Sequence, residues 1–313
     1  MPKLRSSRPV YVPAAVTSFF EICDRNLDGT RISDPLRVGA RGGGFVIREG
    51  STTTASAGQS IAYDEVVING RPSSDARTSL RVVQLMREMF SVPPVRLEHK
   101  ISPPIGSGFG TSGSGALGAA ISISDLLELH LSLSRASEFA HIAEIDSVTG
   151  LGTVISLASG SGAIGLVTEP GAFSIGRVDA ILIDYTKYSL VCVCFGPTEN
   201  SSIMSSEEKR KKVNEFGRRT LDLVRDEGTP EGLLRHSRRF AQQTGIASPE
   251  LLKLADKAVE MGAVGATQNM LGKAIHCLVP KERRETFLKR FGRLVPRESL
   301  FETKLCQSAP VIA

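Results

Sequence analysis

The 313-residue sequence predicts an α+β protein, because strand patterns and helix patterns both occur along it. Residues 95–101 alternate apolar and polar side chains, which is the period of a half-buried strand, and a helical stretch at 116–131 follows a glycine-rich turn. Further on, residues 178–183 and 190–195 have the pattern of two paired strands. The composition changes at about Pro197, and beyond it the chain is mostly helical and charged.

The composition is that of an ordinary globular protein, with 41% apolar and 23% charged residues. The net charge of +5 suits an anionic substrate but is too diffuse to indicate nucleic acid. We assign the densest basic run, residues 209–212, to a solvated helix face. No apolar run is long enough to span a bilayer, and Pro13 interrupts any signal-peptide core. Five cysteines without metal-type spacing indicate reduced thiols in the cytoplasm, and a homodimer is one option for the assembly.

The N-terminal stretch combines a strand with a glycine triplet. Residues 11–20 begin with an apolar run interrupted at Pro13, which favours a strand that places two phenylalanines in the core. The triplet at 42–44 indicates a close backbone approach or positive φ angles. Arg37 and Arg41 lie beside it and could receive a carboxylate through paired hydrogen bonds. The alternative is a surface hairpin with two solvated arginines.

The next elements follow from simple periodicities. Residues 61–68 have a strand pattern, and Asn69-Gly70 after them is a tight-turn signal. Residues 78–90 have the period of an amphipathic helix, as do residues 134–144. In the C-terminal part, Ser248 and Pro249 can begin a helix.

The glycine-rich stretch at 103–120 is the centre of the sequence. It lies between the predicted strand and helix, so its backbone N–H groups can close around a phosphate at the positive end of the helix dipole. The segment Gly108-Phe-Gly110-Thr-Ser-Gly113 also fits the dinucleotide fingerprint, but no acidic residue ends a second strand after it. A Walker-type loop is excluded because no Gly-Lys-Ser/Thr follows, and a flexible linker is the remaining alternative.

The same stretch carries a family resemblance. Pro104-Ile-Gly-Ser-Gly-Phe-Gly-Thr-Ser-Gly-Ser114 resembles the central motif of the GHMP kinases, which reads Pro, three residues and Gly-Leu-Gly-Ser-Ser. Residues 13–20 resemble the opening of the archaeal pantoate kinases within that family, except that Ala14-Ala15 replaces Gly-His. Residues 262–272 resemble the last family motif, a small-residue loop near the phosphates.

Two further segments, Ala-His-Ile-Ala-Glu144 and Gly150-Leu-Gly152, also resemble the pantoate kinases of this family. The family usually continues with an aspartate, which serves as a base or anchors a lysine, whereas this chain has Thr153. Asp146 is nearby in the sequence, but nothing in the sequence assigns it that role. Outside the resemblance, Glu144 could be a capped helix end, and His141 is best explained as a core histidine.

The resemblance implies the two-domain GHMP-kinase fold, with ATP at the junction of the two halves. Residues 1–170 would form an N-terminal domain like domain 2 of ribosomal protein S5, and residues 171–313 an α+β C-terminal domain. Ser112 and Glu144 would bind Mg²⁺, and together with Thr153 they are the expected catalytic residues. The residues expected to bind ATP are Pro104, Gly106, Ser107, Gly108, Gly110, Thr111, Ser112, Gly113, Ser114 and Gly115. The residues expected to bind the acceptor are Thr17, Arg37, Arg41, Gly150 and Gly152.

The implied activity is ATP-dependent phosphorylation of the primary hydroxyl of a branched hydroxy acid. Pantoate is the first choice, which would make the reaction a step toward coenzyme A, and neither nucleic acid nor membrane is expected as a partner. One alternative is a mevalonate 3-phosphate 5-kinase, because Ala14, Ala15 and Thr153 are all departures on the acceptor side. Another is a nucleotide-binding pseudoenzyme, which only Thr153 supports. A general base typically contributes 10²–10⁴-fold in rate, so its loss would slow a kinase without forbidding the reaction.

Overall fold

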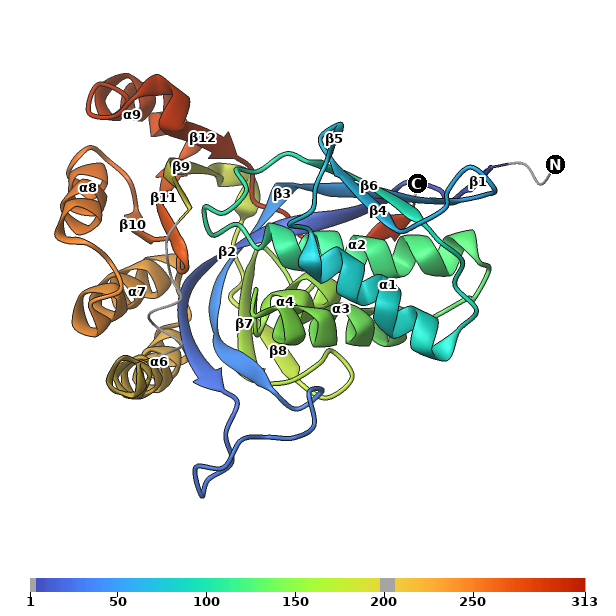
Figure 1. The fold of residues 1–313 in the computed structure, drawn as a ribbon. Helices are drawn as coiled ribbons and strands as arrows, with labels where there is room; N and C mark the ends of the chain where they lie inside the picture. Colours follow the sequence, from blue (N-terminus) through green and yellow to red (C-terminus); the bar gives the residue numbers. More distant parts are fainter. Residues whose placement is uncertain (1–3, 198–205, 313) are drawn as a thin grey trace.

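Two β-sheets, each with its own helices, make up the molecule. This computed structural model describes residues 4–197 and 206–312 of the chain. Figure 1 shows helices α1–α4 gathered on one side of the first sheet, whereas α6–α9 lie at the opposite end of the molecule with the second sheet. The α+β class predicted from the sequence is therefore confirmed.

The first sheet is built on two long strands that pair along most of their length. Its strands are β1 (Arg5–Ser6), β2 (Val10–Cys23), β3 (Gly39–Ala57), β4 (Glu65–Ile68), β5 (Arg71–Pro72), β6 (Arg96–Ile101), β7 (Ile164–Glu169), β8 (Arg177–Ala180) and β13 (Val311–Ile312). Their order is β13-β2-β3-β6-β4-β5, and β1 and β7 also pair with β3. Among the described strands, only β4 and β6 pair in parallel. Asn69 and Gly70 join β4 to β5 with φ of 50° and 79°, which confirms the tight turn.

Four helices cover one face of this sheet. They are α1 (Arg77–Met89), α2 (Thr111–Leu126), α3 (Leu133–Ser147) and α4 (Thr153–Ser159). Val82 and Met86 of α1 and Leu117 and Ile123 of α2 join one buried cluster with Leu97 of β6. Helix α2 can lie this close to β3 because its early residues are small. A side chain at Gly118 would come within 2.4 Å of the Thr53 hydroxyl.

The second sheet has the order β10-β11-β9-β12 and is antiparallel throughout. Its strands are β9 (Tyr188–Pro197), β10 (Gly265–Gln268), β11 (Gly272–Pro280) and β12 (Leu300–Thr303), and its helices are α6 (Glu207–Glu227), α7 (Pro230–Thr244), α8 (Pro249–Glu260) and α9 (Arg284–Phe291). Short 3₁₀ turns lie at Tyr185–Lys187, Lys281–Arg283 and Arg297–Ser299. Helix α7 joins the halves, because the Phe240 ring packs edge-on against Phe19 and Phe20 of β2.

The predicted pairing of residues 178–183 with 190–195 is wrong. Strand β8 pairs with β7 in the first sheet, and β9 pairs with β11 and β12 in the second. Both faces of β9 are buried, with Cys192 in the core under α6 and α7 and Val193 in the core under α8 and α9. Strands β11 and β12 occupy the two edges of β9, so no edge of β9 is left to pair with β8. The chain thus changes sheets between β8 and β9, and a domain boundary at residues 170 and 171 stays a prediction.

Helix α2 also begins and ends earlier than the predicted range of 116–131. It starts at Thr111, so the second half of the glycine-rich motif is its first turn. Residues 113–115 are buried, and this packing overrides the low helix propensity of glycine and serine. The helix ends at Leu126, and Glu128 and His130 beyond it both have positive φ.

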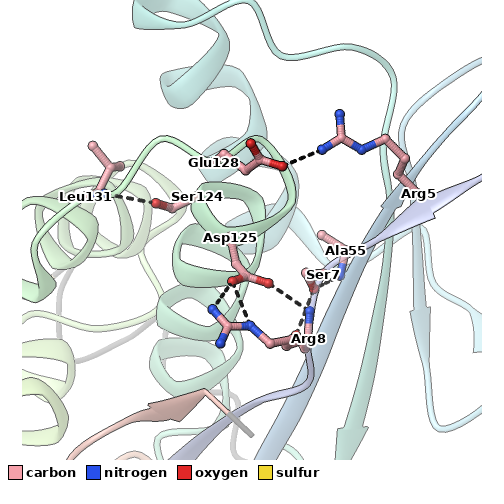
Figure 2. Close-up of polar contacts among 8 residues, drawn as sticks. All are labelled: Arg5, Ser7, Arg8, Ala55, Ser124, Asp125, Glu128 and Leu131. Carbon is pink, nitrogen blue, oxygen red and sulfur yellow. Dashed lines mark hydrogen bonds and ion pairs between the residues drawn. The ribbon is translucent and has the colours of Figure 1, made fainter.

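The N-terminal segment holds the far end of α2 in place (Figure 2). The Arg8 guanidinium and its backbone N–H both donate to the Asp125 carboxylate, and Arg5 donates to Glu128. Asp125 is only 13% exposed at its side chain, whereas Arg5 and Glu128 are both largely exposed. The Arg8 pair is therefore the firmer anchor for the helix whose other end forms the glycine-rich turn.

Within residues 4–197 and 206–312, no helix is both long and apolar enough to cross a bilayer. All five cysteines are free thiols, in line with the expected reduced state.

Candidate active site

A cleft of about 760 Å³ opens where the glycine-rich turn meets β2, β3 and the start of α4. The sequence-predicted residues that line it are Thr17, Arg41, Gly106, Gly108, Gly110, Thr111, Ser112, Gly115, Gly150, Gly152 and Thr153. The structure thus brings together residues that lie far apart in the sequence, from both the phosphate side and the acceptor side of the prediction.

The glycine-rich turn has a backbone shape that few other residues could adopt. Gly106, Gly108 and Gly110 have φ of 78°, 79° and 61°, in the left-handed region. Gly110 is the N-cap of α2, and the first helical hydrogen bond runs from Ser114 N–H to its carbonyl oxygen. The backbone N–H groups between these two residues have no helical acceptor and face the positive end of a 16-residue helix. This arrangement can bind an anionic phosphate.

A hydroxyl and a buried carboxylate lie directly behind this turn. The Ser112 hydroxyl donates to Glu144 Oε1 over 2.7 Å, and the Thr149 hydroxyl lies 3.4 Å from the same oxygen. Glu144 is 2% exposed, and burial raises its pKa to about 7. Among the described residues no lysine or arginine pairs with it. A Cβ atom on Gly150 would come within 2.6 Å of Oε2, so glycine there leaves room for the carboxylate.

Thr153 stands at the start of α4 and touches the turn. Its Cγ2 methyl group would lie 2.6 Å from a Cβ atom placed on Gly110. Within residues 4–197 and 206–312, the Thr153 hydroxyl has no hydrogen-bond partner, and the residue lines the cleft. The hydroxyl is therefore available to a bound molecule.

The other end of the cleft is rich in arginine. Arg41 Nη2 lies 2.6 Å from Glu21 Oε2, and Arg218 Nη2 lies 3.1 Å from Glu21 Oε1. Arg210 pairs with Asp24, and both residues line the cleft. Arg218 itself is largely exposed and does not line the cleft. With Arg31, three guanidinium groups line this end of the cleft, against the two carboxylates of Glu21 and Asp24. The excess positive charge suits an anionic acceptor.

The sequence analysis did not predict Arg31 or Arg210 as site residues. Arg210 belongs to the basic run assigned to a solvated helix face, but it is only 7% exposed, because α6 turns it toward Asp24. Its neighbours Lys211 and Lys212 are exposed, as expected. Neither Arg31 nor Arg210 has a local sequence signal, since the hairpin before β3 and helix α6 meet only in the folded chain.

Several predicted site residues, including the buried Glu144, lie outside the lining of the cleft. Arg37 is exposed and pairs loosely with Asp34 over 3.8 Å. Among the expected ATP-binding residues, Pro104, Ser107, Gly113 and Ser114 do not line the cleft. The Ser114 hydroxyl instead donates to the Thr111 carbonyl oxygen inside the helix.

Two further residues have structural roles. His141 is buried and bonds through Nε2 to the carbonyl oxygens of Pro35 and Val38, which confirms a core histidine. Asp146 pairs with Arg81 on the surface over 2.8 Å and does not replace the missing aspartate.

The glycine triplet and the last motif also meet the cleft. A Cβ atom on Gly44 would lie 1.9 Å from the Val16 carbonyl oxygen, which confirms the close backbone approach. Asn269 donates through Nδ2 to the Ser107 carbonyl oxygen, and Met270 lines the cleft. The C-terminal half therefore contributes directly to the cleft beside the glycine-rich turn.

Comparisons with known proteins agree with this geometry. Residues 77–160 match the model of the GHMP kinases N terminal domain. The chain is 29% identical to a pantoate kinase of Methanocaldococcus jannaschii, over 89% of this chain and 95% of that protein. It is 28% identical to a pantoate kinase of Thermococcus kodakarensis, over 88% of each chain.

Solved structures show the same fold. A phosphotransferase related to the coenzyme A biosynthesis pathway has a TM-score of 0.82 and 26% identity, with 99% of each chain covered. A mevalonate diphosphate decarboxylase from Enterococcus faecalis has a TM-score of 0.72 and 14% identity, covering 99% of this chain and all of the other. At that identity the second likeness concerns the fold alone.

Proposed function

We propose that the chain is a GHMP-type kinase and, within that family, a pantoate kinase, which transfers the γ-phosphoryl group of ATP to the primary hydroxyl of pantoate. The product, 4-phosphopantoate, would lead toward coenzyme A. The observation that carries the proposal is the cleft itself. It joins Ser112, whose hydroxyl bonds to the buried Glu144 behind the cleft wall, to Thr153 and Arg41 on the acceptor side.

The choice of pantoate rests on the relatives named above, both of which are pantoate kinases. Mevalonate-pathway proteins occur among the structural neighbours at identities that speak only for the fold. The arginine-rich end of the cleft adds an independent argument, because pantoate carries a carboxylate that a guanidinium can bind through two hydrogen bonds. A mevalonate 3-phosphate 5-kinase is not favoured.

On the nucleotide side, backbone groups would supply most of the contacts to the phosphates. The N–H groups at the start of α2 would receive the β- and γ-phosphates, at no cost of reorganisation because the glycine turn already holds them. Ile68, Ile101 and Ile105 line the part of the cleft beyond the turn and offer an apolar surface for the base. Phosphoryl transfer depends chiefly on such positioning and on charge neutralisation.

The residues present also fit Mg²⁺. Glu144 is a buried carboxylate that lacks a cationic partner in the described part of the chain, and it lies beside a hydroxyl, so both donors are hard oxygens. No cluster of three or more His, Cys, Asp or Glu residues is found there. A single carboxylate is enough, because Mg²⁺ in kinases is held largely by the phosphates and water. When bound, the ion neutralises phosphate charge during transfer.

On the acceptor side, no carboxylate occupies the place of the family aspartate. The Thr153 hydroxyl can hydrogen-bond the acceptor oxygen and hold it in line with the phosphorus, but it cannot remove a proton near neutral pH. The proton would pass to water or to a phosphate oxygen. We expect a working but slow kinase, because positioning survives and only the contribution of a base is lost.

An ADP-release assay with Mg-ATP and separate acceptors tests the proposal. Pantoate should stimulate ADP release well above the rate with mevalonate, mevalonate 3-phosphate or homoserine. Turnover with mevalonate 3-phosphate in place of pantoate would overturn the choice of acceptor. ATP binding without turnover of any acceptor would instead indicate a pseudoenzyme.

A further inference from the structure

A chain of buried hydrogen bonds connects the phosphate turn to the second sheet. Asn269 Nδ2 donates to the Ser107 carbonyl oxygen over 3.0 Å. Asn269 Oδ1 lies 2.9 Å from His276 Nδ1, and His276 Nε2 lies 2.9 Å from the Ser18 hydroxyl. Asn269, His276 and Ser18 are completely buried, and Ser107 is 1% exposed. None of these four residues lines the cleft.

The acceptors along this chain determine where every proton lies. A carbonyl oxygen can only accept, so the Asn269 amide must turn its NH₂ group to Ser107 and its oxygen to His276. His276 must then carry its proton on Nδ1, which leaves Nε2 to accept from Ser18. Burial lowers the pKa of His276 to about 3, so the ring stays neutral. One tautomer satisfies all three bonds.

The same contacts fix the backbone of the turn. A Cβ atom on Gly108 would lie 2.9 Å from both Asn269 Cβ and the Met270 carbonyl oxygen. Two backbone bonds flank this point, from Met270 N–H to the Thr17 carbonyl oxygen and from Ala15 N–H to the Phe109 carbonyl oxygen. The peptide that links Ser107 to Gly108 is therefore held from the second sheet. Its orientation decides where the next N–H groups point.

We propose that Asn269, His276 and Ser18 are positioning residues that hold the phosphate turn in its ATP-binding conformation, by fixing the Ser107 carbonyl oxygen through a single histidine tautomer. The inference rests on the proposed nucleotide site but not on the identity of the acceptor. None of the three residues would touch ATP, so each acts through the backbone of the turn.

Two substitutions of His276 distinguish the hydrogen bond to Asn269 from the hydrogen bond to Ser18. In His276→Asn the new amide nitrogen takes the place of Nδ1 and can still donate to Asn269. In His276→Gln the amide sits near the place of Nε2, so it keeps the bond to Ser18 but offers no donor to Asn269. Both remove part of a buried ring, so a merely structural role predicts similar effects. The positioning role predicts that the ATP dissociation constant rises about fivefold with Gln and much less with Asn, the scale of one neutral hydrogen bond.

Two substitutions that remove only a hydroxyl group test the same inference with less risk of misfolding. Ser18→Ala removes the donor to Nε2, so the ring keeps its Nδ1–H bond to Asn269 but loses the bond that anchors its other side and fixes its position against Asn269. Thr267→Val is the matched control, because Thr267 lies opposite His276 on β10 and its buried hydroxyl has no partner in the described structure. Ser18→Ala should weaken ATP binding several-fold, and Thr267→Val should leave it unchanged.

ATP affinity is measured by calorimetric titration, with pantoate KM and kcat measured alongside. The expected result is a change in ATP affinity with pantoate KM unaltered. Equal ATP affinity in all four variants, or equal losses with Asn and Gln, would overturn the inference. A wrong acceptor would appear separately, as wild-type protein that binds ATP and releases no ADP with pantoate.

Discussion

The buried carboxyl of Glu144 should make the metal-free protein less stable as the pH rises. Its pKa is raised from 4.5 to about 7 by burial, whereas in the unfolded chain it would titrate near its ordinary value. Below pH 4.5 the group is protonated in both states and this penalty is absent. Between pH 4.5 and pH 7 only the unfolded state ionises, so stability is lost across that window.

The size of the effect follows from the two pKa values. Integrating the difference in bound protons between pH 5 and pH 8 gives a loss of roughly 2–3 kcal/mol in the free energy of unfolding. Glu144→Gln removes the ionisable group, and its amide oxygen can still accept from Ser112. Between pH 5 and pH 8 the stability of the variant, measured relative to the wild type, should therefore increase by about that amount. We nevertheless expect the variant to be a poor kinase.

Urea unfolding at pH 5, 6, 7 and 8, with a chelator present, measures this difference directly. All other titrating groups are common to both proteins, so they cancel in the comparison. Mg²⁺ with ATP should restore the stability of the wild type at pH 8 and have less effect on the variant. Parallel stability curves for the two proteins would refute the reasoning, because Glu144 would then titrate alike in the folded and unfolded states.

Four further predictions concern the two ends of the cleft. Ser112→Ala should leave the fold intact and weaken the use of Mg-ATP tenfold or more, about 1.4 kcal/mol, measured as kcat/KM for ATP, and unchanged ATP kinetics would remove Ser112 from the site. Arg41→Lys should raise the acceptor KM and leave the ATP KM in place, because lysine keeps the charge but not the paired hydrogen bonds, and equal effects on both constants would contradict this role. Thr153→Ala should cost about 1–2 kcal/mol of transition-state stabilisation in kcat/KM, the scale of a neutral hydrogen bond, and no change would mean that the hydroxyl does not touch the acceptor. Thr153→Asp should speed the turnover of pantoate by supplying a base, whereas it would block an acceptor that already carries a phosphate.

The chain alone determined the phosphate side of the site. The strand, the glycine turn and the helix between residues 95 and 126 are neighbours in the sequence, and their chemistry comes from the backbone. The positive φ angles at Gly108 and Gly110 favour glycine, so the glycines in the sequence already indicate this backbone conformation. The prediction that Ser112 and Glu144 act together came from the family resemblance. The structure then showed that their side chains are hydrogen-bonded.

Only the tertiary structure decided the acceptor side and the role of the second sheet. Arg210 comes from a helix whose basic run resembles any solvated face, and it is buried because α6 packs against β2 near Asp24. Arg37 and Arg41 are indistinguishable in the sequence, yet one is exposed and the other is paired in the cleft. Such differences depend on contacts between distant segments, which local periodicity does not record.

The second sheet gives the clearest contrast. Sequence patterns predicted the strands near residues 178 and 190, but they could not say that these strands belong to different sheets, because alternation fixes which face is buried and not which partner is adjacent. In the same way, His276 is one more apolar-flanked histidine in the sequence. Only the structure connects it to the glycine-rich turn, because strand β11 and the turn before it bring Asn269 against the Ser107 carbonyl oxygen.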